Sequence, residues 1–280
     1  MKFGAHVSVR GGVGYAPDRA AEIGCETFQI FTRNQRQWRA KPLDQENIEA
    51  FIRKASAYAP LCAHASYLIN LAASNQETLQ KSRESMVDEI RRANQLGIQY
   101  VVVHSGAHMG LGRERGLKTL IESLEVVFEA TRQQESTTLL LENSAGAGTT
   151  LAADLSDLSH VQEAMKHHPR LGFCLDTCHL FASGHHFARY DQYQTLRDYI
   201  DRTLGIENIP VLHFNDSKKP FASRVDQHEK IGFGRIGVEP FSFWINDPAW
   251  HDKIAILETP GGEENYKREI ALLKSIRDGA

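Results

Sequence analysis

Residues 172–179 read Gly172-Phe-Cys-Leu-Asp-Thr-Cys-His179, and this stretch indicates both a fold and a site. The apolar run from Leu171 to Leu175 is typical of a buried strand. Asp176 breaks the run, and His179 follows three residues later. At the carboxyl end of a strand, such a carboxylate and imidazole can project into one cavity, as metal binding requires. An isolated Asp-x-x-His is more commonly a helix N-cap followed by a surface histidine, so the interpretation depends on the rest of the chain.

Eight short runs with the composition of strands alternate with stretches of helical periodicity. Several runs are apolar throughout, as in Tyr100-Val-Val-Val103, which is typical of parallel strands covered on both faces. The expected strands are Lys2–Val7, Thr27–Phe31, Pro60–Ala65, Gln99–His104, Thr137–Glu142, Leu171–Asp176, Ile209–Phe214 and Ile254–Glu258. Eight strand–helix alternations over about 250 residues predict an α/β protein with one TIM (β/α)8 barrel spanning residues 1–280. An open doubly wound sheet is the alternative, but it predicts a glycine-rich phosphate motif after the first strand, which Gly11-Gly12 does not supply.

Apolar residues at helical spacing mark the helices between these strands. One helix is expected to begin with a capping box at Ser74 and Glu77 and to end at Gly97. By contrast, residues 215–237 show little helical periodicity. A long irregular connection in a compact domain is usually functional or disordered, and this one holds Asp226 and His228. We therefore expect a functional loop.

The composition is that of a soluble globular protein, with 41% hydrophobic and 24% charged residues and a net charge of −3. This charge does not indicate nucleic-acid binding, which would have to come from a local basic surface or from bound metal. The four cysteines form no C-x-x-C pair, which favours free thiols in a reducing compartment. The amino terminus lacks a signal-peptide core, and no apolar run is long enough to cross a bilayer. We expect a cytoplasmic protein without a membrane partner.

Side chains that bind metal ions end most of the expected strands, and the ends of parallel barrel strands converge on one mouth. With His6 set aside, the candidate ligands are His64, His104, Glu142, Asp176, His179, His213, Asp226, His228 and Glu258. Any one of them alone is more commonly a hydrogen-bonded rim residue, but separate rim roles do not explain their common position. Five histidines and four carboxylates are too many for one tetrahedral ion. They predict two or three zinc-type sites with positions open for water or substrate.

Short segments spread over nearly the whole chain resemble those of the endonuclease IV family, the second family of apurinic/apyrimidinic (AP) endonucleases. They include Gly4-Ala-His-Val-Ser8, Phe31-Thr-Arg-Asn-Gln-Arg-Gln-Trp38, His64-Ala-Ser-Tyr-Leu-Ile-Asn70, His213-Phe-Asn-Asp-Ser-Lys218, Ser223-Arg-Val-Asp-Gln-His228 and Ile256-Leu-Glu-Thr259. Because several segments occur in the right order, the resemblance is specific. The fold it implies is a TIM barrel, in agreement with the strand pattern.

The resemblance also implies a trinuclear zinc site, although manganese or iron suits nitrogen and oxygen ligands as well. The implied sets are His64 and His104 with the bridging Glu142, Asp176 with His213 and Glu258, and His179 with Asp226 and His228. Glu142 and Glu258 are the implied catalytic residues, Glu258 by orienting or deprotonating the nucleophile. Four carboxylates against three dications leave a charge of about +2, which would attract a phosphodiester.

The reaction implied by the resemblance is hydrolysis of the phosphodiester 5′ to abasic sites in double-stranded DNA, leaving a 3′-hydroxyl and a 5′-deoxyribose phosphate. Repair of blocked 3′ ends, within base excision repair, is expected too. The side chains implied for DNA contact are Arg36, Gln37, Tyr67, Leu68, Lys218 and Arg224. Arg36 and Tyr67 are expected to enter the base stack so that the abasic nucleotide can flip out. We expect a monomer.

Two other functions are open to the same residues. A sugar isomerase or epimerase on a related metal-dependent barrel uses fewer ligands, with a lysine or paired acids for proton transfer at carbon. The nine candidate ligands and the loop containing Arg36 and Trp38 argue against it. A catalytically inactive DNA-damage binder would lack at least one core ligand, and none is missing from the sequence.

Overall fold

Eight parallel strands close into a barrel in the order β1-β10-β7-β6-β5-β4-β3-β2. The structure is a computed structural model that describes residues 1–134 and 136–279. The barrel strands are β1 (Lys2–His6), β2 (Thr27–Phe31), β3 (Cys62–His64), β4 (Tyr100–His104), β5 (Thr138–Glu142), β6 (Leu171–Asp176), β7 (Val211–His213) and β10 (Ile254–Leu257). The predicted TIM barrel is confirmed, and each strand begins and ends within two residues of its expected bounds.

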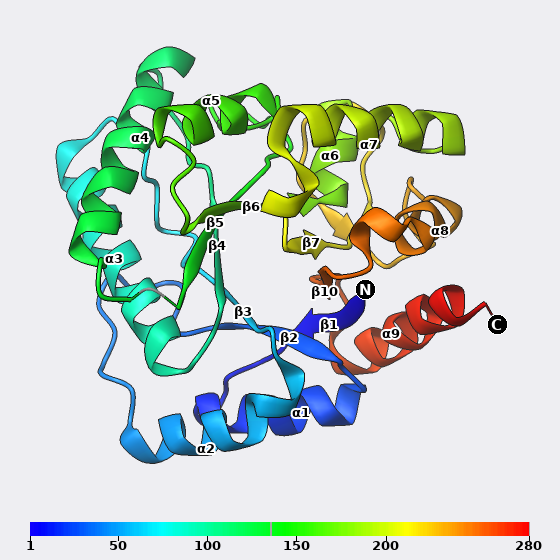
Figure 1. Ribbon diagram of the computed structural model, residues 1–280, viewed down its shortest axis with the longest axis horizontal. Coiled ribbons are helices and arrows are strands. Elements are labelled where there is room, and N and C mark those ends of the chain that lie inside the picture. The colour runs from blue at the N-terminus through cyan, green and yellow to red at the C-terminus, as the bar shows by residue number, and fades with distance from the viewer. Residues whose placement is uncertain (135, 280) are drawn as a thin grey trace.

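Helices surround the strands on the outside of the barrel (Figure 1). They are α1 (Ala16–Ile23), α2 (Gln45–Ala55), α3 (Gln76–Gln95), α4 (Arg113–Ala130), α5 (Ser156–Ala164), α6 (Thr177–Ser183), α7 (Tyr190–Leu204), α8 (Glu239–Asn246) and α9 (Gly262–Asp278). Short 3-10 turns lie at Val13–Tyr15, Ser56–Tyr58, Ile206–Asn208 and Pro248–Trp250. In the long loop, β8 (Asp216–Ser217) and β9 (His228–Glu229) form a separate antiparallel pair. None of the helices in the described part of the chain is long and apolar enough to cross a bilayer.

The start of α3 differs from the expected capping box. Asn75 is the N-cap, and its side chain accepts a hydrogen bond from the Thr78 amide at 2.9 Å. The prediction that Ser74 caps the helix is wrong, because the adjacent asparagine is an equally favourable cap. The end is as expected: Gly97 follows the helix with φ +67°, a left-handed conformation that favours glycine.

Two layers of apolar side chains hold the strands in place. The larger core lies between the strands and the surrounding helices, and a smaller one fills the barrel interior. The interior core consists of Cys62, Val102, Leu140, Cys174, Val211, Ile254 and Ile256. All four cysteines are buried and free, as predicted. Because these apolar side chains fill the barrel interior, polar side chains can gather only beyond them, at the carboxyl ends of the strands.

A partly buried ion pair links the first strands to the last helix. Arg277 Nη1 on α9 lies 2.9 Å from Glu26 Oε2 and donates to the Met1 carbonyl at 3.0 Å. Burial tends to raise the pKa of Glu26. Hydrogen bonds from Arg277 and the Phe3 amide, with the nearby charge of Lys274, outweigh burial and hold the pKa below its ordinary value.

The substitution Glu26→Gln is expected to lower the free energy of unfolding by about 1 kcal/mol at neutral pH. Because the folded-state pKa is depressed, this stabilisation is complete above the unfolded-state pKa near 4.5. It is lost as the pH falls through the lower folded-state value. Urea titrations of both proteins at neutral pH and at about pH 3 would measure the difference. An equal difference at the two pH values would contradict the assignment.

Candidate metal centre at the barrel mouth

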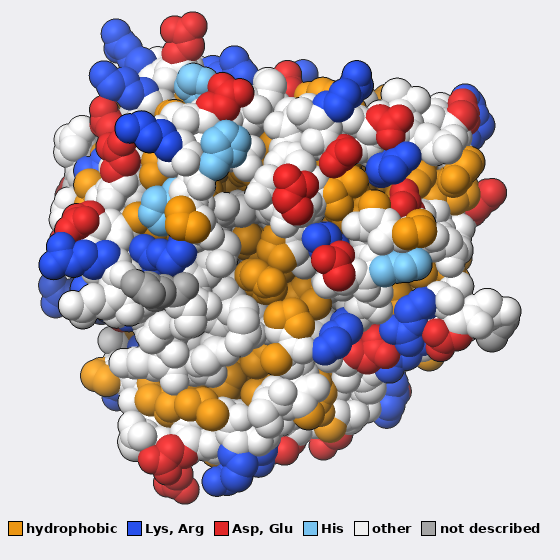
Figure 2. Space-filling view, viewed as in Figure 1, with side chains coloured by type: hydrophobic (Ala, Val, Ile, Leu, Met, Phe, Trp, Pro, Cys, Tyr) orange, Lys and Arg blue, Asp and Glu red, His pale blue; other side chains and the backbone are white. Residues whose placement is uncertain are grey.

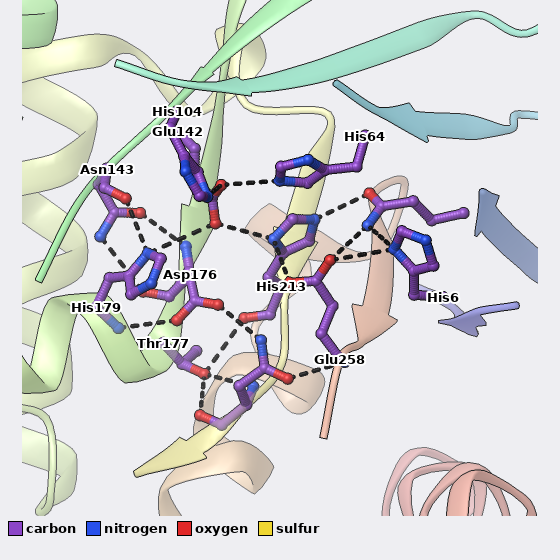
Figure 3. Close-up of polar contacts among 12 residues, drawn as sticks. His6, His64, His104, Glu142, Asn143, Asp176, Thr177, His179, His213 and Glu258 are labelled. Atoms are coloured by element: carbon purple, nitrogen blue, oxygen red, sulfur yellow. Dashed lines mark hydrogen bonds and ion pairs between the residues drawn. The ribbon is translucent and has the colours of Figure 1, made fainter. Parts of the chain in front are cut away.

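The alternation of side chains along the strands places most of the predicted ligands in one layer. Residues two apart on a strand share a face. Each of six predicted ligands lies two residues after a residue of the interior core. The pairs are Cys62 with His64, Val102 with His104, Leu140 with Glu142, Cys174 with Asp176, Val211 with His213 and Ile256 with Glu258. These six side chains therefore form the next inward-facing layer, at the carboxyl ends of the strands (Figure 3).

Glu142 lies at the centre of this layer, with imidazoles facing both of its oxygens. Its Oε2 is 3.4 Å from His64 Nε2 and 3.3 Å from His104 Nε2. Its Oε1 is 3.0 Å from His213 Nδ1 and 3.5 Å from His179 Nδ1. Since the two oxygens face different histidines, this buried carboxylate has the placement needed to bridge two ions.

The outer part of the cluster comes from α6 and the long loop. Asp226 is close to both neighbouring histidines, with Oδ2 3.1 Å from His179 Nε2 and Oδ1 3.3 Å from His228 Nε2. His228 Nε2 also lies 3.5 Å from Asp176 Oδ2. The Asp226 side chain is 48% exposed, whereas that of Asp176 is fully buried, so this group is the most open to solvent.

The three predicted ligand sets are each brought together in the described part of the chain. Donor atoms within 4.8 Å of one another belong to His64, His104 and Glu142; to Glu142, Asp176, His213 and Glu258; and to His179, Asp226 and His228. Cys178 forms a further group with Asp176 and His228. Its thiol, however, donates to the Gln227 carbonyl at 3.7 Å, and burial raises its pKa. We therefore leave Cys178 out of the candidate ligands.

The histidine hydrogen bonds test whether these residues suit a metal ion. In each of four histidines, one ring nitrogen lies within hydrogen-bonding distance of a protein oxygen. The contacts are His64 Nδ1 with the Ala65 carbonyl (2.7 Å), His179 Nδ1 with the Asn143 carbonyl (2.9 Å), His228 Nδ1 with the Glu258 carbonyl (3.3 Å) and His213 Nε2 with Gln29 Oε1 (3.0 Å). These oxygens only accept, so the nitrogen that faces them keeps its proton, and the other nitrogen offers a lone pair to the cluster once the ring is neutral. The Nε2 atoms of His179 and His228 are buried without a hydrogen-bond partner among the described residues. Such nitrogens beside carboxylates fit a divalent cation.

The histidines and carboxylates of the cluster shift one another's pKa values. Burial lowers the pKa of His179, but Asp176, Asp226 and Glu142 outweigh it and raise that pKa well above its ordinary value. For Glu142 burial acts in the opposite direction and tends to raise the pKa, but the facing histidines, His213 foremost, outweigh it and hold that pKa well below the ordinary value. Glu142 is therefore ionised at neutral pH and requires positive charge beside it.

Comparison with known proteins agrees with this geometry. The family described as Xylose isomerase-like TIM barrel matches residues 17–276. A "Probable endonuclease 4" of Chloroflexus aurantiacus is 41% identical over 283 residues, which cover 100% of this chain and 99% of that protein. The chain belongs to the endonuclease IV family. It is therefore an enzyme, an endonuclease.

This endonuclease IV family member aligns with solved structures of two kinds of protein. The crystal structure of endonuclease IV from Thermus thermophilus aligns with a TM-score of 0.88 and 34% identity, covering 100% of both chains. A D-tagatose 3-epimerase-like protein aligns with a TM-score of 0.74 and 21% identity, covering 99% of this chain and 97% of that one. The second likeness shows the shared fold alone.

Gln29 belongs to the candidate site, and the sequence interpretation missed it. Its Nε2 donates to Glu258 Oε1 at 2.6 Å, and its Oε1 faces His213 Nε2 at 3.0 Å. It thus fixes both a carboxylate and an imidazole of this endonuclease IV family site. His6, which was set aside, lies 3.4 Å from Glu258 Oε1 and 3.0 Å from Gln29 Nε2. A glutamine between the apolar residues Phe28 and Ile30 of a buried strand is the signal that could have revealed it.

Two asparagines complete the hydrogen bonding of the buried ligands. Asn215 Nδ2 donates to Asp176 Oδ2 at 2.6 Å, and its Oδ1 accepts from the Glu258 amide at 2.9 Å. Asn143 Oδ1 accepts from the Asp176 amide at 2.7 Å. Both asparagines lie within two residues of a strand-end ligand, in segments that resemble the family. Only the folded structure, however, shows which groups they bind. Asn215 thus orients the Asp176 carboxylate before an ion binds, and the two bonds to backbone amides fix the main chain that carries Asp176 and Glu258.

Asp176 is both a helix cap and a member of the cluster. Its Oδ1 accepts a hydrogen bond from the His179 amide at 2.8 Å, which makes it the N-cap of α6. The alternative interpretation of Asp-x-x-His as a cap is therefore right about Asp176. It is wrong about His179, which is 4% exposed and points into the cluster rather than to solvent (Figure 3).

Asp216 organises the long loop. This buried carboxylate accepts from the amides of Gly232 (3.0 Å), Gly234 (3.1 Å), Ile236 (2.8 Å) and Gly237 (3.2 Å). A Cβ on Gly234 would lie 2.3 Å from Asp216 Oδ1, so the close approach needs glycine. The loop that carries Asp226 and His228 is therefore ordered without regular secondary structure over most of its length, in agreement with a functional role.

The predicted DNA-contact residues lie on loops that follow the strands. Arg36 and Gln37 are exposed after β2, and Lys218 and Arg224 are exposed on the long loop, while Leu68 is half-buried after β3. Tyr67 is 56% exposed, and its ring lies 5.6 Å from that of His64 and 5.7 Å from that of His104. A cavity of about 310 Å³ extends from Tyr67 along His104, His179 and Asp226. On the face that Figure 2 shows, basic and acidic side chains are intermixed.

Proposed function

We propose that the chain is a metal-dependent AP endonuclease that hydrolyses the phosphodiester 5′ to abasic sites in double-stranded DNA. The products would be a 3′-hydroxyl and a 5′-deoxyribose phosphate. The single observation that carries the proposal is the bridging placement of Glu142, between the histidines of the three ligand sets. Full-length similarity to proteins named endonuclease 4 and endonuclease IV supports the same reaction.

Three zinc ions are the proposed cofactor, one held by each of the three predicted ligand sets, with manganese or iron able to occupy the same nitrogen and oxygen donors. Bound there, such ions supply an acidified water and stabilise charge on the reacting phosphate. The mixed donor set, five imidazoles and four carboxylates, supports zinc rather than a hard cation such as magnesium.

Glu258 is proposed to orient the attacking water and to accept its proton. Burial raises the pKa of Glu258, but His213, His6 and His64 outweigh it and hold the carboxylate ionised. Gln29 binds one of its oxygens and Asn215 binds its backbone amide, so the side chain is fixed in place. With 14% exposure the carboxylate remains accessible from the mouth. An ionised, oriented and accessible carboxylate is suited to general base catalysis.

The loops at the mouth are proposed to open the duplex. Arg36 and Tyr67 would enter the base stack, while Gln37, Leu68, Lys218 and Arg224 would contact the backbone and neighbouring bases. An abasic nucleotide lacks a base to unstack, which makes it the easiest one to flip into the mouth. The same open site would admit blocked 3′ ends in base excision repair. We propose that the enzyme acts as a monomer, since one chain supplies all nine ligands.

The double substitution Arg36→Ala with Tyr67→Ala is expected to weaken binding to an abasic duplex by about 10- to 100-fold, because both side chains that enter the base stack are lost. The metal content should be unchanged, since neither residue belongs to a ligand set. Fluorescence anisotropy with a labelled duplex, together with elemental analysis, would measure both. Unchanged affinity would refute the role of these side chains in opening the duplex.

The proposed function as a whole is tested by elemental analysis of the purified protein and a cleavage assay on one abasic duplex. We expect about three zinc equivalents per chain and a cut immediately 5′ to the abasic site. An undamaged duplex of the same sequence is the matched control. Stoichiometric metal without cleavage of the abasic duplex would contradict the proposal.

A further inference from the structure

A buried network of charged side chains connects α3 to two loops at the mouth. The β2 loop is residues 32–41, which include Arg36, and the β3 loop is residues 65–68, which include Tyr67. Glu89 on α3 is 1% exposed and lies 3.3 Å from Arg33 Nε of the β2 loop. Buried charges of this kind are rare and need a partner, so the position of this pair calls for a physical reason.

Glu89 contacts both loops directly. Its Oε2 accepts from the Thr32 hydroxyl of the β2 loop at 2.5 Å. Its Oε1 accepts from the Ser66 amide of the β3 loop at 3.2 Å. One carboxylate therefore joins two segments that come from different strands and that meet the duplex in the proposed function.

The backbone on either side of Arg36 is held by this network. Arg33 Nη2 donates to the carbonyls of Gln37 at 3.3 Å and Trp38 at 3.1 Å. On the other side, the Ser66 hydroxyl donates to the Gln35 carbonyl at 2.7 Å. Arg36 itself is exposed, so its backbone is fixed while its side chain is free to meet a ligand.

The backbone around Tyr67 is held in the same way. The preceding amide, of Ser66, is bound by Glu89, and the following amide, of Leu68, donates to Ser66 Oγ at 3.3 Å. Arg92 on α3 completes the network with bonds to the carbonyls of Thr32 (2.6 Å) and Lys41 (2.9 Å), at the two ends of the β2 loop.

Stability alone is a poor explanation for this arrangement. A buried ion pair stabilises a fold little compared with apolar side chains of similar volume, and α3 already packs through Met86 and Ile90. The polar groups of the network are instead directed at loop backbone. Their common effect is to fix one loop relative to the other.

We infer that Glu89 and Arg33 are positioning residues for damage recognition: their buried ion pair sets the relative placement of the β2 and β3 loops, so that Arg36 and Tyr67 engage the duplex as one unit. The inference rests on the proposed function and assigns to α3, on the outer side of the barrel, a part in substrate binding. Two side chains that must enter the same base stack gain from being placed in advance, because less ordering remains to be done on binding.

The test compares a duplex containing a tetrahydrofuran abasic analogue with bis(4-nitrophenyl) phosphate, a phosphodiester too small to reach both loops. Glu89→Ala is expected to raise KM for the duplex about tenfold or more, since misplacement by about 1 Å can cost on the order of 100-fold. Its metal content and its rate on the small phosphodiester should equal those of the wild type. Parallel loss on both substrates would show a general structural role and overturn the inference.

Two milder variants keep the test valid if Glu89→Ala folds poorly. Ser66→Ala removes only the hydroxyl that joins the loops and should raise KM in the same sense but less. Glu89→Gln keeps the shape and one acceptor oxygen and should lie between the wild type and Glu89→Ala. Met86→Ala, on the same helix but in the apolar core, is the matched control, with lower stability and unchanged KM expected.

A double-mutant cycle decides whether Glu89 acts through the two exposed side chains. In the Arg36→Ala, Tyr67→Ala background, adding Glu89→Ala should have no further effect on KM, because the groups that it positions are gone. Additive effects would overturn the inference. If the wild type fails to cleave the abasic duplex at all, the proposed function is wrong, and this inference is overturned with it.

Discussion

Replacing Glu258 with glutamine is expected to reduce kcat on an abasic duplex by on the order of 1,000-fold, while the barrel stays folded. The amide matches the carboxylate in shape, and its oxygen can still accept the hydrogen bond that Gln29 now donates at 2.6 Å. The bond from the backbone amide to Asn215 is unaffected, since it does not involve the side chain. What is lost is the negative charge and the ability to take a proton from water.

Single-turnover cleavage, circular dichroism and elemental analysis would separate chemistry from folding and metal loss. Glu239→Gln, at an exposed carboxylate on α8 outside the cluster, is the control and should behave as wild type. Near-normal kcat in Glu258→Gln would remove Glu258 from the mechanism. A loss of one metal equivalent would attribute the lower kcat to the role of Glu258 as a ligand rather than to proton transfer.

Removing metal with a chelator is expected to abolish cleavage and to destabilise the protein. Ligands that bind only the folded state stabilise it by about 4 kcal/mol when present at roughly 1,000 times Kd, so the thermal midpoint should fall clearly. Restoring zinc should recover both properties, whereas magnesium, which prefers oxygen ligands, should not. Full activity in protein shown to be metal-free would refute the metal centre.

The pH dependence of metal binding follows from the same cluster. Asp176, Asp226 and Glu142 raise the pKa of His179, and Cys174, Glu258 and Glu142 raise that of His213, both well above the ordinary value and against the opposing effect of burial. In the metal-free protein these rings are therefore protonated at neutral pH, and each must lose a proton to bind an ion. Metal affinity should fall as the pH is lowered, and binding should release protons. Calorimetry in buffers of different ionisation enthalpy would count them; binding without proton release would contradict the assignment.

The barrel and the candidate ligands could be predicted because both follow from the strand pattern. Strand–helix alternation indicated eight strands, and a histidine or carboxylate at the end of an apolar run indicated each candidate strand-end ligand. Gln29, Asn143 and Asn215 could not be found in this way. Their roles are hydrogen bonds between residues distant in the sequence, such as the one from Gln29 to Glu258. No periodicity marks such pairs.

The same reason explains why Glu89 and Asp216 escaped notice. On a helical pattern Glu89 is one more charged residue, and only the folded chain shows that it faces two loops rather than solvent. Asp216 stands in a segment that resembles the family, but the amides that it binds lie more than fifteen residues further along the chain. Charge burial, which decides the importance of both residues, is a property of the packed molecule.

The contact between Arg277 and Met1 has a practical consequence. Strands β1 and β10 are neighbours, and α9 runs from the mouth back to the opposite end, so residues 1 and 279 both lie far from the metal centre. A surface anchor or fluorescent reporter attached at residue 279, which is exposed, would leave the mouth facing outward. Single immobilised molecules could then be observed by fluorescence on stretched DNA, with the barrel mouth unobstructed.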